Sequence, residues 1–212
     1  MPMTKAQLLA WIEKQNAVFL DKKEYLTDLD AAIGDADHGI NMNRGFAKVM
    51  EKLPTVADKD LPTILKTVGM TLMSSVGGAS GPLYGTFWMK GAMALDGKAE
   101  MTTADFKAFL EAAVGGIVQR GRPELGDKTM YDLWGPVLAA VKAADDATPL
   151  AEVVAAALPV AEAALAATIP LQARKGRASY LGERSIGVLD AGATSCFLIL
   201  KTLGTSVQQR LS

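Results

Sequence analysis

Apolar residues recur at helical spacing along almost the whole chain. One such stripe consists of Leu61, Leu65, Val68 and Leu72, and similar stripes follow in later segments. A spacing of three and four residues places apolar side chains on one face of an α-helix. No comparable stretch alternates between apolar and polar residues, which is the pattern of a half-buried strand. The sequence therefore predicts an all-α fold.

The stripes and the helix-start signals together predict nine helices. Asp60, Gly81 and Thr148 are each expected to cap or begin a helix, because a proline follows each of them within two residues. A chain of 212 residues with short loops fits a single domain, an antiparallel up-and-down bundle. The helices are expected near residues 4–20, 24–33, 40–52, 61–75, 82–95, 103–119, 129–145, 149–168 and 191–206.

Three connections carry residues that ordinary linkers do not need. They span residues 30–41, 74–82 and 172–192. In an up-and-down bundle, loops separated by an even number of helices open at the same end. Two predicted helices separate the first connection from the second, and four more separate the second from the third. All three are therefore expected at one rim of the bundle.

Charge and composition exclude several classes of protein. The chain has 22 basic and 23 acidic side chains, so nucleic acid is not expected as a direct partner. The lone Cys196 stands in an apolar run and is interpreted as a buried thiol of a cytoplasmic protein. The start of the chain does not have the pattern of a signal peptide. The alanine-rich stretch 153–171 contains Pro159 and Glu162, so no membrane span is expected.

Three aspartates lie within eight residues at the first of these connections. Asp30, Asp35 and Asp37 could simply cap helices and turns, which is the usual role of a lone Asp-x-Asp. Three hard oxygen donors this close repel one another unless a cation lies between them, and oxygen ligands favour magnesium. An EF-hand is excluded because Ile40 occupies its glycine position and Phe46 its glutamate position.

The other two connections suit an anion. Residues 74–82 are small and precede a helix, so backbone N–H groups and the helix dipole could face a phosphate, although glycines there could equally just end a helix. Residues 172–184 carry Arg174, Lys175, Arg177 and Arg184. A basic run is usually a solvated surface, but near an acidic metal cluster it suits a nucleoside di- or triphosphate. Residues 121–129 resemble a Walker A loop only loosely, because Asp127 interrupts the motif and no strand precedes it.

The four segments together resemble a known family. Residues 27–44, 74–85, 126–130 and 172–185, which include Gly34-Asp35-Ala36-Asp37-His38-Gly39 and Gln172-Ala173-Arg174-Lys175-Gly176-Arg177, resemble the nucleotide-binding L subunits of bacterial dihydroxyacetone kinases. The resemblance spans nearly all of residues 1–212. It is weakest at residues 96–104 and in the alanine-rich helix after Pro149.

The resemblance implies an eight-helix antiparallel barrel that holds ADP or ATP at one rim through two Mg²⁺ ions. The nine predicted helices then exceed the expected number by one, and the segment most open to doubt is 24–33. The resemblance implies metal ligation by Asp30, Asp35 and Asp37, which with Arg177 would also act in catalysis. The implied nucleotide contacts are His38, Gly39, Ile40, Asn41, Ala79, Ser80, Gly121, Met130, Arg177, Leu189, Asp190 and Ala191. Ala191 departs from the proline that is common at this position.

The resemblance also implies a division of labour. Tightly bound nucleotide would take a phosphoryl group from a phosphocarrier M subunit of the phosphoenolpyruvate-dependent phosphotransferase system. It would then pass the group to dihydroxyacetone on a K subunit. A homodimer is the expected assembly. Two alternatives stay open: a nucleotide-bound docking protein for a transcription regulator, and a nucleotide domain of the fatty-acid-kinase type.

Overall fold

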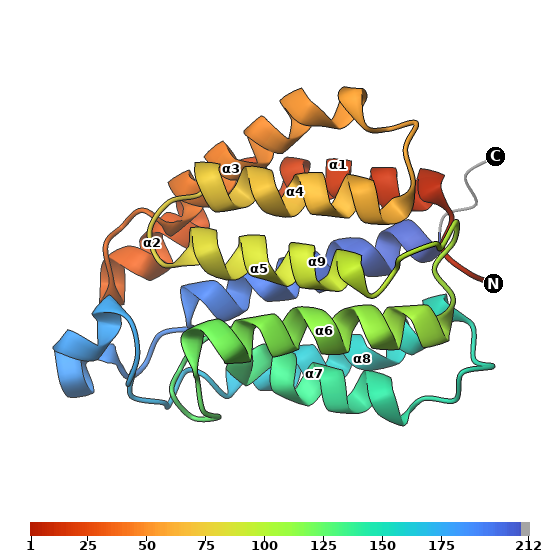
Figure 1. The fold of residues 1–212 in the computed structure, drawn as a ribbon. Coiled ribbons are helices and arrows are strands. Elements are labelled where there is room, and N and C mark those ends of the chain that lie inside the picture. Colours follow the sequence, from red (N-terminus) through yellow and green to blue (C-terminus); the bar gives the residue numbers. More distant parts are fainter. Residues whose placement is uncertain (209–212) are drawn as a thin grey trace.

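In a computed structural model that describes residues 1–208, the chain folds into nine α-helices and two short 3₁₀ helices (Figure 1). The described residues contain no strand, and Met3 and Met101 form one isolated β-bridge. The predicted all-α class is therefore confirmed. The helices are α1 (Lys5–Asp21), α2 (Lys23–Ile33), α3 (His38–Lys52), η1 (Leu53–Thr55), α4 (Leu61–Ser75), α5 (Ser80–Met93), α6 (Thr103–Gly121), α7 (Tyr131–Ala143), α8 (Leu150–Ala166), η2 (Arg177–Ser185) and α9 (Ala191–Gln208).

Eight of the nine α-helices close into a ring. Contacts run from α1 to α3, then in order from α3 to α9, and back from α9 to α1. Neighbours in the ring run in opposite directions, as Figure 1 shows for α4 to α9. The eight-helix antiparallel barrel is thus confirmed. The doubt about residues 24–33 was wrong, because they form α2, an additional helix at one end of the ring between α1 and α3.

Aromatic side chains fill the interior of the barrel. Trp11 of α1 meets Trp88 of α5 with ring centroids 5.0 Å apart, and Phe87 stacks on Trp134 of α7 at 5.1 Å. Trp11 Nε1 donates to the carbonyl oxygen of Ile199 at 3.0 Å, which ties α1 to α9. Edge and offset contacts of this kind stabilise a packed core. Cys196 is buried in the same core, as expected.

Two of the three predicted helix starts were misplaced. Asp60 caps α4 as expected, and its side chain accepts from the Thr63 amide at 3.0 Å. Helix α5 begins at Ser80, before Gly81, because Pro82 fits the first turn, where an amide hydrogen has no partner to lose. Helix α8 is capped by Pro149 in an extended conformation, not by Thr148.

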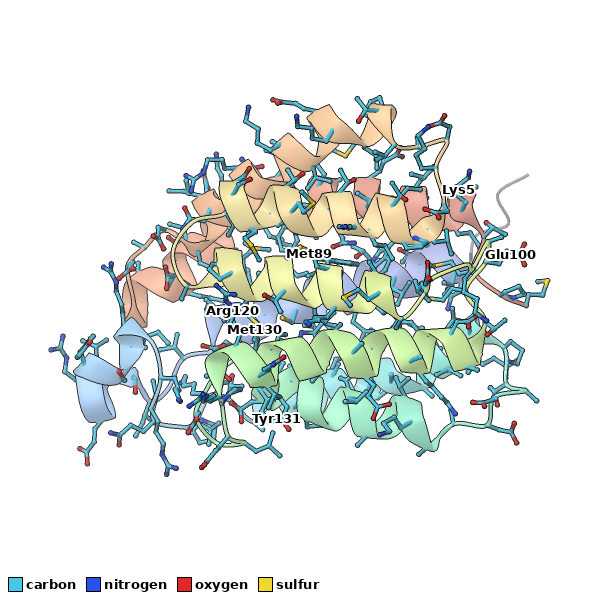
Figure 2. The ribbon with its side chains drawn as sticks, in the orientation of Figure 1. Lys5, Met89, Glu100, Arg120, Met130 and Tyr131 are labelled. Atoms are coloured by element: carbon cyan, nitrogen blue, oxygen red, sulfur yellow. The ribbon has the colours of Figure 1, made fainter. Side chains whose placement is uncertain are left out.

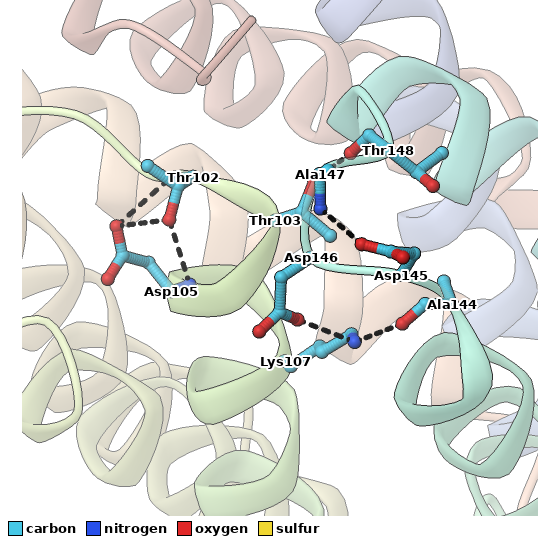
Figure 3. Close-up of polar contacts among 9 residues, drawn as sticks. All are labelled: Thr102, Thr103, Asp105, Lys107, Ala144, Asp145, Asp146, Ala147 and Thr148. Atoms are coloured by element: carbon cyan, nitrogen blue, oxygen red, sulfur yellow. Dashed lines mark hydrogen bonds and ion pairs between the residues drawn. The ribbon is translucent and has the colours of Figure 1, made fainter.

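The end of the barrel away from α2 is held by local polar contacts (Figure 3). Thr102 and Asp105 form a capping box at the start of α6. Lys107 pairs with Asp146 at 2.7 Å and also donates to the carbonyl oxygen of Ala144. Thr103 Oγ1 donates to the carbonyl oxygen of Thr148 at 2.6 Å. These contacts fix α6 to the α7–α8 connection and leave the opposite rim for the residues described next.

Candidate functional site

A cavity of about 600 Å³ opens at the rim beside α2. Its walls come from the α2–α3, α4–α5 and α8–α9 connections, so the prediction that these three meet at one rim is confirmed. A fourth wall comes from Gly121 at the end of α6 and from Lys128 and Met130 of the α6–α7 connection. Met130 and Arg120 lie toward this rim in Figure 2, whereas Lys5 and Glu100 lie at the far end.

Most of the predicted site residues line this one cavity. They are Asp30, Asp35, Asp37, His38, Asn41, Ala79, Ser80, Gly121, Met130, Arg177, Asp190 and Ala191. Gly39, Ile40 and Leu189 do not line it. His38 and Asn41 are three positions apart and share one face of α3, so the two residues between them point elsewhere. Gly39 packs against α2, and Ile40 is 47% exposed.

Asp30 joins the end of α2 to the beginning of α3. Its Oδ2 accepts from the backbone amides of Asp37 at 2.9 Å and of His38 at 3.1 Å. A carboxylate at a helix N-terminus is stabilised by the free amides and by the helix dipole. Between Asp35 and Asp37, Ala36 adopts a left-handed φ of 60°, which a non-glycine residue adopts only when its surroundings hold it there.

Arg177 from η2 reaches across the rim to Asp35. Its Nε lies 3.0 Å from Asp35 Oδ2 and its Nη1 lies 3.0 Å from Asp35 Oδ1. The pair is bidentate, the geometry in which guanidinium and carboxylate interact most strongly. It brings together residues 142 positions apart in the sequence.

Asp37 is close enough to Asp30 for the two carboxyl groups to influence each other. Burial raises the pKa of Asp37, and a hydrogen bond with Asp30 and the charges of Asp30 and Asp35 raise it further, whereas Asn41 lowers it. Two adjacent carboxylates need a proton or a cation between them, so Asp30 and Asp37 fit a divalent ion.

The three aspartates do not converge on one point in the arrangement seen. Within residues 1–208, no three acidic, histidine or cysteine side chains are grouped closely enough to hold a metal ion. Both oxygens of Asp35 are engaged by Arg177. Asp35 could join Asp30 and Asp37 around an ion only if Arg177 released it.

The glycine-rich connection is held by Arg44 of α3. Arg44 Nη2 donates to the carbonyl oxygen of Val76 at 2.7 Å and to Asn41 Oδ1 at 2.8 Å. Gly77 and Gly78 follow with φ of 80° and 58°, a conformation that favours glycine. The turn leads directly into α5, so the free amides at the start of that helix lie at the cavity, where an anion would be favoured.

His38 is the cavity end of a buried polar chain. Ser195 Oγ donates to the carbonyl oxygen of Gly192 at 2.8 Å and therefore accepts from His38 Nε2 at 2.9 Å. His38 Nδ1 is left as the acceptor facing Ser80 Oγ at 3.4 Å. Tyr84 OH bonds to Ser195 from the other side. Burial lowers the pKa of His38 to about 4, so the ring is neutral at pH 7.

Asp190 caps α9 at the cavity wall, where its Oδ2 accepts from the Ala193 amide at 2.8 Å. Burial raises the pKa of Asp190 to about 7. The bond to Ala193 and the charge of Lys128 oppose this rise, whereas the charges of Asp132 and Asp30 add to it. Asp190 therefore titrates near neutral pH.

Comparisons with known proteins identify the family. The model of the DAK2 domain matches residues 32–205. The PEP-dependent dihydroxyacetone kinase ADP-binding subunit DhaL of Escherichia coli K12 is 47% identical over 212 residues, which cover 99% of this chain and all of that subunit. This chain belongs to the DAK2 domain family. The ADP-binding subunit DhaL of the PTS-dependent dihydroxyacetone kinase of Lactococcus lactis is 40% identical over 195 residues, covering 92% of this chain and 94% of the relative.

A solved structure supports the fold. The dihydroxyacetone kinase of C. freundii in complex with AMP-PNP and Mg²⁺ matches with a TM-score of 0.71 at 24% identity. The match covers 97% of this chain and 35% of that longer chain. At this identity the likeness shows that the helical barrel is shared.

Sequence reasoning missed several residues around the cavity. Arg44 and Tyr84 lie within segments 27–44 and 74–85 but were given no role there, and Ser195 lies outside all four segments. Their contacts join different parts of the chain. Lys128 was part of an incomplete Walker A pattern and of segment 126–130 but was given no role, and its ammonium group contacts backbone carbonyls. The exclusion of a P-loop agrees with this placement.

Two observations concern the outside of this DAK2 domain. A hollow of about 890 Å³ lies among α4, α5 and α6 and contains none of the predicted site residues. Met89 and Arg120, which line it, are labelled in Figure 2. Across residues 1–208, every helix is too short or too polar to cross a membrane.

Proposed function

We propose that this chain is the nucleotide-binding subunit of a phosphoenolpyruvate-dependent dihydroxyacetone kinase. The observation that carries the proposal is the rim cavity, where paired carboxylates, a glycine-rich turn with a helix N-terminus, and a guanidinium group face one space. A nucleoside diphosphate needs all three, because its phosphates require both cations and backbone donors. The end-to-end match to an ADP-binding subunit supports the choice of ligand.

Each wall of the cavity has a distinct task in this proposal. Gly121 and Met130 of the α6–α7 connection would contact the adenine. The amides of Ala79 and Ser80 at the start of α5 would bind the diphosphate. Asp30, Asp35 and Asp37 would hold two Mg²⁺ ions, which when bound neutralise and align the phosphate oxygens. Arg177 would offset the charge that spreads over the phosphoryl oxygens during transfer.

The reaction consists of two phosphoryl transfers. In the first, the bond between phosphorus and the phosphocarrier subunit breaks and a bond to the β-phosphate of ADP forms, which gives ATP. In the second, the β–γ bridge breaks and a bond to a hydroxyl oxygen of dihydroxyacetone forms, with loss of the hydroxyl proton. Phosphoryl transfer depends mainly on alignment and charge stabilisation, so no covalent nucleophile is required in this chain.

The partners follow from this scheme. A K subunit would present dihydroxyacetone and an M subunit would present the phosphoryl group, both at the rim that holds the cavity. The names of the Escherichia coli and Lactococcus lactis relatives, which give a PEP- or PTS-dependent kinase, support this division. The nucleotide would stay bound and cycle between ADP and ATP.

Reconstitution tests the function. The chain is mixed with purified K subunit and phosphorylated M subunit, and dihydroxyacetone phosphate is measured by coupled oxidation of NADH. We expect turnover without added ATP, and loss of turnover in Asp35→Asn. Asp58→Asn, an exposed aspartate away from the cavity, serves as the matched control and should retain turnover. Product formation that depends on a pool of free ATP would contradict the proposal.

A further inference from the structure

Lys128 is a buried cation in the α6–α7 connection. It is 2% exposed and has a left-handed φ of 62°. Its ammonium group donates to the carbonyl oxygens of Val188 at 2.6 Å, Ser185 at 2.8 Å and Leu171 at 3.1 Å. An ammonium has three N–H donors, which these three bonds can occupy, and a fourth carbonyl oxygen, that of Ile169, lies 3.5 Å away. In the part of the chain that the structure describes, no carboxylate lies within ion-pair distance of Lys128.

The three carbonyls belong to the two stems of one loop. Leu171 lies on the stem that follows α8, and Ser185 and Val188 lie on the stem that leads into α9. Two further bonds close the stems on each other: the Gly187 amide donates to Ile169 O at 2.8 Å, and the Ala173 amide donates to Ser185 Oγ at 2.8 Å. Such a loop, with joined ends and a long excursion, resembles an Ω-loop. Its excursion is η2, which carries Arg177.

The loop is anchored to the barrel mainly at its base. The Arg174 amide donates to the carbonyl oxygen of Asp127 at 3.0 Å, next to Lys128 in the chain. Beyond this anchor, η2 packs against α2, and Arg177 pairs with Asp35. Burial lowers the pKa of Lys128, because withdrawing a charged ammonium group from water costs free energy. Hydrogen bonds to the carbonyl oxygens at the base of the loop offset this free-energy cost.

We infer that Lys128 is a positioning residue that holds the loop base so that Arg177 faces the phosphates of the bound nucleotide. The inference rests on the proposed nucleotide site. Without the ammonium group, three carbonyls, of which that of Ser185 is buried, would lose this donor, and the two stems would be held together less firmly. Arg177 would then lose its fixed approach to the rim, while Gly121 and Met130 would keep theirs. Lys128 lines the cavity, but its ammonium group is bonded to the carbonyls of the loop stems, so it acts on the phosphate end of the ligand through the loop.

A double-mutant cycle tests the inference. ADP affinity is measured with Mg²⁺ by calorimetry for the wild type, Lys128→Met, Arg177→Ala and the double variant. We expect Lys128→Met to weaken ADP binding about tenfold in the wild type and less than twofold in the Arg177→Ala background, because Lys128 acts through Arg177. AMP affinity should change less than twofold. Equal losses in both backgrounds would overturn the inference.

Controls separate positioning from general stability. Hydrogen exchange in Lys128→Met should rise in residues 172–184 and stay unchanged in the nine α-helices. Lys142→Met, which removes an exposed lysine paired with Glu111, should not alter ADP affinity. If Lys128→Met does not fold, Ser185→Ala removes the hydroxyl that joins the stems and should give a smaller loss of the same kind. If the losses of ADP affinity in Ser185→Ala and Arg177→Ala were additive in the double variant, the inference would also be refuted. A wild-type protein that binds no ADP would refute the proposed function itself.

Discussion

Replacing Gly39 with alanine is expected to disturb the acidic rim, although Gly39 does not line the cavity. A Cβ atom at this position would lie 1.9 Å from the carbonyl oxygen of Lys23 and 2.6 Å from Thr27 Oγ1. Real Cβ contacts essentially never fall below 3.0 Å, so α2 and α3 must separate by about 1.1 Å, the difference between 3.0 and 1.9. The closer atom is backbone and cannot rotate away.

The separation acts directly on Asp30. Its bond to the Asp37 amide is 2.9 Å long, and a shift of that size would stretch it to as much as about 4.0 Å, beyond hydrogen bonding. Overpacking of this kind costs about 1–3 kcal/mol of unfolding free energy. Because Asp30 and Asp37 are the proposed metal ligands, we also expect ADP affinity to fall about tenfold, or about 1.4 kcal/mol.

Urea denaturation and calorimetry measure the two effects. Gly115→Ala is the matched control, because Gly115 lies on the exposed side of α6 with no atom within 4 Å of an added Cβ. It should gain about 0.5–1 kcal/mol from the better helix propensity of alanine and bind ADP normally. A Gly39→Ala protein as stable as the wild type, with unchanged ADP affinity, would refute the packing argument.

Three further predictions concern single side chains. Asp35→Asn removes a charge from the proposed metal site and should lower ADP affinity at least about tenfold, or about 1.4 kcal/mol, in calorimetry; an unchanged affinity would remove Asp35 from the site. The folded-state pKa of Asp190 lies near 7, above its ordinary value of 3.8, so its stabilising contribution is lost as pH rises between those values. Urea titrations from pH 5 to pH 8 should therefore show the wild type losing stability relative to Asp190→Asn, whereas a constant difference would contradict the shift. Burial raises the pKa of Cys196 to about 12, so the thiol should react with Ellman's reagent only after unfolding, and fast reaction of the folded protein would show that it is accessible.

The sequence predicts most of the fold because helical periodicity is a local signal. All nine predicted helices are present, including α2, whose segment 24–33 was the most doubtful of the nine. An even number of predicted helices separates the three chemically unusual loops, and this correctly predicts that they share a rim. Errors occur at helix starts such as Gly81 and Thr148, where one proline is compatible with several first-turn positions.

The sequence predicts the site residues that lie close together in the chain, but it does not predict contacts between residues far apart in the chain. Asp30, Asp35 and Asp37 lie close in sequence and line one cavity. Ile40 and Leu189 were predicted to contact nucleotide but lie outside the cavity lining. The bond from His38 to Ser195 spans 157 positions, and no pattern within one segment could have identified it. The hydrogen bonds of Lys128 to the loop stems are made to backbone carbonyls, which have no sequence signature.

The proposed metal site can be tested most directly by anomalous diffraction from crystals grown with ADP and Mn²⁺ in place of Mg²⁺. We predict two manganese peaks in the rim cavity, beside the carboxylate oxygens of Asp30, Asp35 and Asp37 and the diphosphate, with Asp35 released from Arg177. ADP bound in the cavity with no manganese peak at these aspartates, or manganese peaks only elsewhere on the barrel, would contradict the proposed site.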